Sequence, residues 1–154
     1  MSADRFGIRR LSSADARAVA GIVQEAYAPY AERIGTKPGP MLEDYDEVLR
    51  RHPAWGAYEG NALLGVLVVR DDGERFVLDN VAVQPEAQGR GIGKALLAHG
   101  EREALSRGYD RVELYTNVAM TKNIALYAAL GYVETERRRE GGFDRVYMAK
   151  ELSG

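Results

Sequence analysis

The stretch that decides the fold of this chain is Gln84-Pro-Glu-Ala-Gln-Gly-Arg-Gly-Ile-Gly-Lys94. It follows an apolar run at 76–83, which is typical of a strand, and leads into an apolar repeat at 91–107, which is typical of an amphipathic helix. A glycine-rich turn between a strand and a helix points several backbone N–H groups at one place, where the helix dipole adds about half a positive charge. Because glycine has no Cβ, a phosphate can approach the backbone closely. The stretch therefore predicts a cradle for a pyrophosphate.

Two familiar phosphate cradles do not fit this spacing. A Walker A loop needs glycine, four residues, and then Gly-Lys-Ser/Thr, but Gln88 stands five residues before Gly93 and Ala95 follows Lys94. A dinucleotide fingerprint would need its third glycine at position 94, and it opens at the first strand of a βαβ unit. Here the loop follows the fourth predicted strand.

Composition excludes several classes of protein. The 154 residues include no cysteine and two histidines, which excludes disulfides, cysteine nucleophiles and a multi-histidine metal site. With 21 basic and 23 acidic residues, the net charge of −2 lacks the attraction on which most nucleic-acid binders depend. The longest apolar run, 62–69, is far shorter than the ~20 residues of a membrane helix, and 1–10 lacks the apolar core of a signal peptide. We expect one cytoplasmic domain, 1–154, with no metal and with no nucleic-acid or membrane partner.

The remaining elements alternate in type. Turn residues and apolar patterning predict a mixed α/β sheet with helices on its faces. A serine at 12 or 13 caps the first helix, and Pro29 stops it near residue 28. The predicted order is strand 6–10, helix 13–28, helix 41–51, strands 55–58, 63–70 and 76–83, helix 91–107, strand 112–115, helix 119–130, and strands 132–138 and 143–150.

Three motifs occur in a specific order: Asp-Asn-Val-Ala-Val at 79–83, Gln-Gly-Arg-Gly-Ile-Gly at 88–93, and Asn-Ile-Ala-Leu-Tyr-Ala-Ala-Leu-Gly-Tyr at 123–132. The second fits the pattern Gln/Arg-x-x-Gly-x-Gly/Ala. Together they resemble the GNAT superfamily of acetyl-CoA-dependent N-acetyltransferases. The resemblance implies a mixed, mostly antiparallel central sheet flanked by helices, with the fourth and fifth strands splayed apart to admit acetyl-CoA.

The resemblance also implies roles for individual residues. Asn123 would contact the pantetheine arm, and Tyr127 would protonate the departing CoA thiolate. Without the resemblance, Tyr127 would be interpreted as a core tyrosine and Asn123 as a helix-surface residue. The backbone of Val81, Ala82 and Val83 would pair with the pantetheine, and the N–H groups of Gln88, Gly89, Arg90, Gly91, Ile92, Gly93 and Lys94 would hold the pyrophosphate.

The absence of a cysteine for an acyl-enzyme favours direct attack of an amine on the thioester in a ternary complex. The amine must lose a proton, and Asp79 is the best single candidate for the base because burial in an otherwise apolar strand would favour that role. A chain of water molecules is the alternative. A backbone N–H near Val83 is the simplest donor for the developing oxyanion.

The acceptor is expected to bind near residues 27–45, where aromatic residues and carboxylates would suit a cationic amine. The same aromatic residues are also consistent with anchoring a loop to the core. An amino acid, a polyamine, an antibiotic, a peptide N-terminus and a protein lysine all stay open as acceptors. A homodimer is also open, as are a non-catalytic CoA-binding module and an interaction domain whose glycine turn serves only packing. The candidate acceptor residues are Tyr30, Met41, Tyr45 and Asn117.

The run Arg137-Arg138-Arg139 has two interpretations. It is expected to form a solvated strand face. Recognition of an acidic substrate is the alternative.

Overall fold

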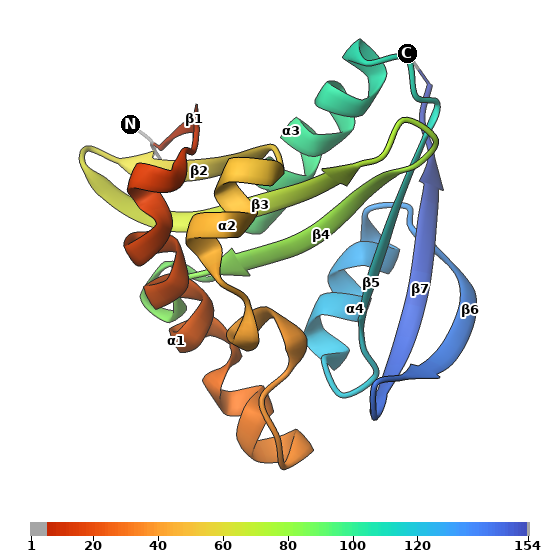
Figure 1. Cartoon of the computed structure of the whole chain (residues 1–154). Helices are drawn as coiled ribbons and strands as arrows, with labels where there is room; N and C mark the ends of the chain where they lie inside the picture. Colours follow the sequence, from red (N-terminus) through yellow and green to blue (C-terminus); the bar gives the residue numbers. More distant parts are fainter. Residues whose placement is uncertain (1–5, 154) are drawn as a thin grey trace.

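Seven strands form one sheet in the order β1-β2-β3-β4-β5-β7-β6 (Figure 1). The computed structural model describes residues 6–153; residues 1–5, which carry part of the signal-peptide argument, and residue 154 lie outside the described residues. Neighbouring strands are antiparallel except for β4 and β5, which are parallel. The mostly antiparallel sheet expected from the sequence is therefore confirmed.

The bounds of the elements lie close to those predicted. The strands are β1 (Gly7–Arg10), β2 (Ala54–Glu59), β3 (Ala62–Asp71), β4 (Phe76–Val83), β5 (Arg111–Asn117), β6 (Val133–Glu140) and β7 (Phe143–Glu151). The helices are α1 (Ala16–Ile34), α2 (Tyr45–Arg51), α3 (Ile92–Ser106) and α4 (Thr121–Ala129), with short 3-10 turns η1 (Ser13–Asp15), η2 (Gly39–Leu42) and η3 (Pro85–Ala87).

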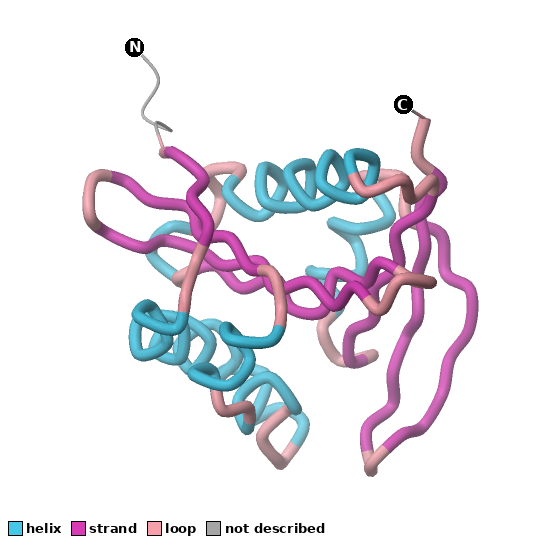
Figure 2. The backbone as a smooth tube through the Cα atoms, turned by 45° about the horizontal axis from the view of Figure 1, so that its top comes forward, coloured by secondary structure: helices cyan, strands magenta, loops and turns pink. Residues whose placement is uncertain are grey.

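Helices cover both faces of the sheet. Figure 2 shows the strands between two helical layers, with α1 and α2 on one side and α3 on the other. Each layer buries its own apolar cluster: Val19, Ile22 and Val23 of α1 pack on the first face, and Leu96 and Leu97 of α3 pack on the second. Burial of these side chains stabilises the layers, at about 1.5–3 kcal/mol for each large aliphatic group.

Two predicted helix boundaries were wrong. The first helix does not stop at Pro29 but continues to Ile34, where Gly35 adopts a left-handed conformation as the C-cap. Pro29 faces solvent while the buried stripe reaches Tyr27, so tertiary packing outweighs the hydrogen bond that the proline removes. The predicted helix 41–51 is the turn η2 followed by α2. Helix α2 begins only after Asp44, whose side chain accepts hydrogen bonds from the N–H groups of Asp46 and Glu47.

A β-bulge in β4, at Asp79, lies where the pairing of β4 with β5 ends. Leu78 pairs with Val69 on β3 and Asn80 pairs with Val68, so Asp79 is an extra residue on β4. The pairing of β4 with β5 covers only Val77 and Leu78 and ends just before the bulge. The splay between the fourth and fifth strands that the sequence predicts is thus present, and the β4 edge that faces β5 is unpaired beyond residue 78.

The bulge also exchanges the two faces of β4. Before it, Leu78 packs in the layer of α3; after it, Val81 and Val83 pack in that layer, and Ala82 packs in the layer of α1. Even-numbered residues of β4 therefore face α3 before Asp79 and α1 after it, because side chains alternate along a strand and the bulge adds one residue.

Candidate functional site

A cavity of about 400 Å³ follows the open edge of β4. Residues from α1, β4, the turn after β4, the first turn of α3, and α4 line it. The lining residues are Ala26, Tyr27, Tyr30, Val81, Ala82, Val83, Ala87, Gln88, Gly89, Gly91, Ile92, Gly93, Lys94, Met120, Lys122, Asn123, Leu126 and Tyr127. We call it the β4 cavity. It contains nearly all the residues that the sequence assigned to acetyl-CoA.

The glycine turn has the backbone that a phosphate cradle requires. Gly89 and Gly91 have φ angles of +86° and +82°, a region that favours glycine. No side chain caps α3, which leaves its first N–H groups directed out of the helix end toward the turn. Two residues with ammonium groups, Lys94 and Lys122, also line the β4 cavity. Arg90 does not line it, because its guanidinium donates a hydrogen bond to Glu59 on β2 at 2.7 Å.

Tyr127 and Asn123 of α4 both line the β4 cavity. Burial raises the pKa of the Tyr127 phenol, so this group is protonated at neutral pH and holds its proton more tightly than an exposed tyrosine does. Its ring packs edge-on against Tyr132, with 6.0 Å between the ring centroids. The position is at once part of the core and part of a cavity, so the two interpretations of Tyr127 are compatible.

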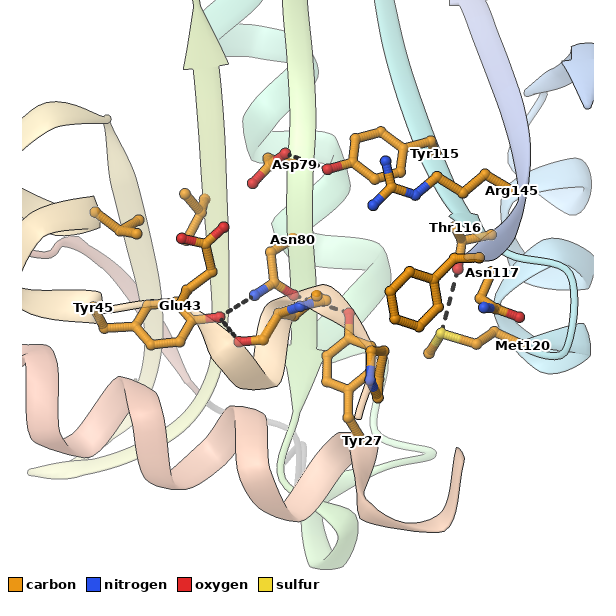
Figure 3. Close-up of a pocket in the computed structure, with 16 residues that line it drawn as sticks. Tyr27, Glu43, Tyr45, Asp79, Asn80, Tyr115, Thr116, Asn117, Met120 and Arg145 are labelled. Carbon is orange, nitrogen blue, oxygen red and sulfur yellow. Dashed lines mark hydrogen bonds between the residues drawn. The ribbon is translucent and has the colours of Figure 1, made fainter. Parts of the chain in front are cut away.

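A second, smaller cavity of about 100 Å³ lies where β4 and β5 separate (Figure 3). We call it the splay cavity. It shares Tyr27 and Met120 with the β4 cavity, so the two spaces adjoin at these side chains. The splay cavity is lined by Tyr27, Pro38, Gly39, Pro40, Glu43, Tyr45, Val48, Val68, Asp79, Asn80, Tyr115, Thr116, Asn117, Met120, Phe143 and Arg145.

Asp79 lies in this cavity with polar partners. Tyr115 donates a hydrogen bond of 3.0 Å to Oδ1, and Nε of Arg70 lies 3.1 Å from Oδ2. The apolar surroundings expected from the sequence are therefore absent, because the bulge exposes Asp79 to an arginine of β3 and a tyrosine of β5. Burial and the neighbouring carboxylate raise the pKa of Tyr115 to about 12. Arg70 also lies 3.0 Å from Nε2 of His52 and 3.6 Å from Glu43.

A chain of hydrogen bonds that the sequence did not predict lies in the wall of the splay cavity. The Tyr27 hydroxyl donates to Oδ1 of Asn80 at 2.9 Å, and Nδ2 of Asn80 donates to the Tyr45 hydroxyl at 2.9 Å. The Tyr45 hydroxyl donates in turn to the Pro40 carbonyl at 2.6 Å. Burial raises the pKa of both tyrosines. An asparagine in an alternating apolar strand was the available signal, since a buried amide needs partners.

The four predicted acceptor residues are not brought together. Tyr45 and Asn117 line the splay cavity, and Tyr30 lines the β4 cavity. Met41 lines neither of these two cavities, and its carbonyl accepts a hydrogen bond from Gln24.

The comparison with known families agrees with the three motifs. Residues 19–132 match the family model described as the acetyltransferase (GNAT) family. The chain belongs to this family. Its resemblance to the GNAT superfamily is thereby confirmed, together with the splayed α/β fold.

Curated GNAT relatives match only part of this chain. The [ribosomal protein bS18]-alanine N-acetyltransferase of Escherichia coli (strain K12) is 36% identical over 92 residues, which cover 56% of this chain. The chain spans 60% of the length of that relative. A mycothiol acetyltransferase of Thermobispora bispora is 43% identical over 60 residues, which cover 39% of this chain and 19% of that protein.

Solved structures match the whole GNAT domain. The crystal structure of the ribosomal-protein-S18-alanine N-acetyltransferase from Escherichia coli has a TM-score of 0.80 and 25% identity, covering 97% of this chain and 96% of that one. The PaiA N-acetyltransferase from Thermoplasma acidophilum, solved in complex with coenzyme A, has a TM-score of 0.78 and 20% identity, covering 96% and 99%. Among residues 6–153, no helix is long and apolar enough to cross a membrane.

Proposed function

We propose that this chain is an N-acetyltransferase that transfers the acetyl group of acetyl-CoA directly to a primary amine. The observation that carries the proposal is the meeting of two cavities at Tyr27 and Met120. One cavity begins at a phosphate cradle, and the other holds a carboxylate beside the separated strands. A donor in the first and an acceptor in the second would bring their reactive groups together where the cavities adjoin.

The β4 cavity suits acetyl-CoA along its length. On the unpaired edge of β4, the main-chain groups of Val81 and Val83 are available to the pantetheine amides, as in an added strand, whereas those of Ala82 face β3. The N–H groups from Gln88 to Lys94 suit the pyrophosphate, and a relative of the same fold was solved with coenzyme A bound. Gln88 already donates to the Val83 carbonyl at 3.3 Å, so the main-chain contacts of Val83 would use its N–H.

The transfer needs a base, a hydrogen-bond donor for the oxyanion and a general acid from this chain. Asp79, or a water molecule beside it, takes the proton that the ammonium group loses. The neutral amine nitrogen then attacks the acetyl carbon, and a backbone N–H near Val83 holds the oxygen while it is negative. The carbon–sulfur bond breaks, and the nitrogen, which is positive after the attack, loses its second proton to solvent. Tyr127 gives its proton to the departing sulfur and recovers one from solvent. The products are an acetylated amine and CoA with a free thiol.

Two measurements test the proposal together. Acetyl-CoA should raise the melting temperature, because a ligand that binds only the native state stabilises it. Free thiol should then appear when amines of different classes are added. A higher melting temperature with no thiol from any amine would favour the non-catalytic CoA-binding module. An unchanged melting temperature at millimolar acetyl-CoA would contradict both. The homodimer, the cytoplasmic location and the single domain stay predictions.

A further inference from the structure

Arg145 differs from the other arginines of the β6–β7 hairpin. Arg137, Arg138 and Arg139 each pair with a carboxylate on the hairpin itself, at 3.0, 2.8 and 3.2 Å, which agrees with the solvated strand face expected from the sequence. Among residues 6–153, no carboxylate lies within ion-pairing distance of Arg145. Its guanidinium instead lines the splay cavity.

Arg145 packs against an aromatic ring: its guanidinium carbon lies 4.8 Å from the centroid of the Tyr115 ring. Across the hairpin it stands opposite Arg138, which pairs with Glu136. Glu140 is near enough to feel the charge of Arg145, but that carboxylate accepts from the Tyr147 hydroxyl and lies 3.6 Å from Arg138. A guanidinium without a carboxylate partner keeps donors that match an anion in the cavity.

Negative charge lies at the other end of the same cavity. Asp79 and Glu43 both line it, and they share one guanidinium, that of Arg70. Two carboxylates against one arginine leave an excess of negative charge there. Tyr115 lies between the two ends, with its hydroxyl on Asp79 and its ring face under Arg145, and Figure 3 shows both side chains reaching into one space.

We infer that the acceptor is a small amine with a carboxylate close to its nitrogen, such as a free amino acid, and that Arg145 binds this carboxylate. The amine would then point to Asp79 and the adjoining β4 cavity. A guanidinium presents a planar fork that matches a carboxylate with two hydrogen bonds. A peptide N-terminus has a neutral amide where an amino acid has its carboxylate, so it would leave Arg145 without an anion. This inference rests on the proposed function.

The test compares acids with their amides. The common amino acids and their α-carboxamides are assayed by thiol release with acetyl-CoA, together with a peptide amide that begins with alanine. We expect kcat/KM to be at least about tenfold higher for the acid than for the amide. Arg145→Gln should raise KM for the acid about 10- to 100-fold, with a smaller change in kcat and little change for the amide. Arg139→Gln, which removes a paired arginine of the same hairpin, should leave KM and kcat unchanged for both the acid and the amide.

A binding measurement covers the case of slow turnover. With CoA present, the acid should raise the melting temperature more than the amide does, and Arg145→Gln should abolish the difference. Equal or better use of the amide or the peptide would overturn the inference while leaving the acetyltransferase proposal intact. Equal losses for acid and amide in Arg145→Gln would overturn it as well, as would equal melting shifts. Failure of the proposed function is different: acetyl-CoA itself then gives no melting shift, or no amine releases thiol.

Discussion

The hydroxyl of Tyr115 on β5 donates a hydrogen bond of 3.0 Å to Oδ1 of Asp79 on β4, one residue beyond the last backbone pair between these strands. A side-chain contact thus replaces the ladder at the point where the strands separate. It also fixes one oxygen of the carboxylate that we propose as the base. Arg70 fixes the other oxygen at 3.1 Å, so Asp79 is held on both sides.

Replacing Asp79 with asparagine tests its role in removing the proton. Asp79→Asn keeps the size of the side chain and removes its charge, so kcat should fall about 10²- to 10⁴-fold if the carboxylate is the base. The acidic limb of the pH–rate profile should shift as well. Asp144→Asn, which changes an exposed carboxylate on β7, is the control. An unchanged kcat and an unchanged profile would assign the proton to a chain of water molecules.

The Tyr127→Phe variant removes one hydroxyl from the β4 cavity. We expect kcat to fall about 10²- to 10⁴-fold, as is typical of a lost general acid, while the Kd for acetyl-CoA measured by calorimetry changes little. Tyr132→Phe is the matched control, because that ring packs on Tyr127 but its hydroxyl donates to Glu101. Equal turnover in the two variants would remove Tyr127 from the chemistry.

Gly93 offers a cleaner test of the cradle than Gly91, whose positive φ would strain any side chain. A Cβ at Gly93 would make ordinary contacts of 3.7 Å with Val83 and 3.8 Å with Leu126. Gly93→Ala should therefore retain binding and raise stability by about 0.5 kcal/mol or less, because Gly93 lies in the first turn of α3 and not in its interior. Gly93→Leu should fill the space between α4 and β4 and weaken acetyl-CoA about tenfold or more. Calorimetry and urea unfolding measure the two effects; equal affinity in both variants would place the cofactor elsewhere.

The histidines predict how stability depends on pH. Burial lowers the pKa of both His52 and His99, and the guanidinium of Arg70 lowers that of His52 further. Because the unfolded chain binds these protons more tightly, stability should be complete above about pH 6.5 and should fall as the pH drops through the lowered pKa values. Urea midpoints between pH 8 and pH 5 measure this. The double variant His52→Gln, His99→Gln should have a flatter profile, and an identical slope would contradict the assignment.

Local features of the sequence were sufficient to predict the glycine turn and the helix that follows it. Left-handed backbone at Gly89 and Gly91 and the repeat of α3 depend on neighbouring residues, and such signals survive in any tertiary context. The end of α1 could not be predicted in this way. Whether a helix continues past Pro29 depends on what its apolar stripe packs against, which is decided by distant strands.

The splay cavity was also beyond prediction, for a different reason. The sequence predicted the strands that carry Asp79 and Arg145, but it did not predict the register in which those strands pair. It therefore could not predict that the two side chains line the same cavity. Asn80 was missed because its partners, Tyr27 and Tyr45, lie on two helices that are far from it in the sequence.

The bulge at Asp79 lets β4 carry one residue more than β3 without disturbing the pairing beyond it. Val81 and Ala82 face the same layers as their partners Leu67 and Val66 on β3. Deleting Asp79 would therefore leave Val81 on the side of α3 and Ala82 on the side of α1, and the wall of the β4 cavity would keep its residues. The deletion would instead remove the carboxylate that Tyr115 and Arg70 hold where the strands separate. The extra residue thus serves the splay and contributes nothing to the alternation of the sheet.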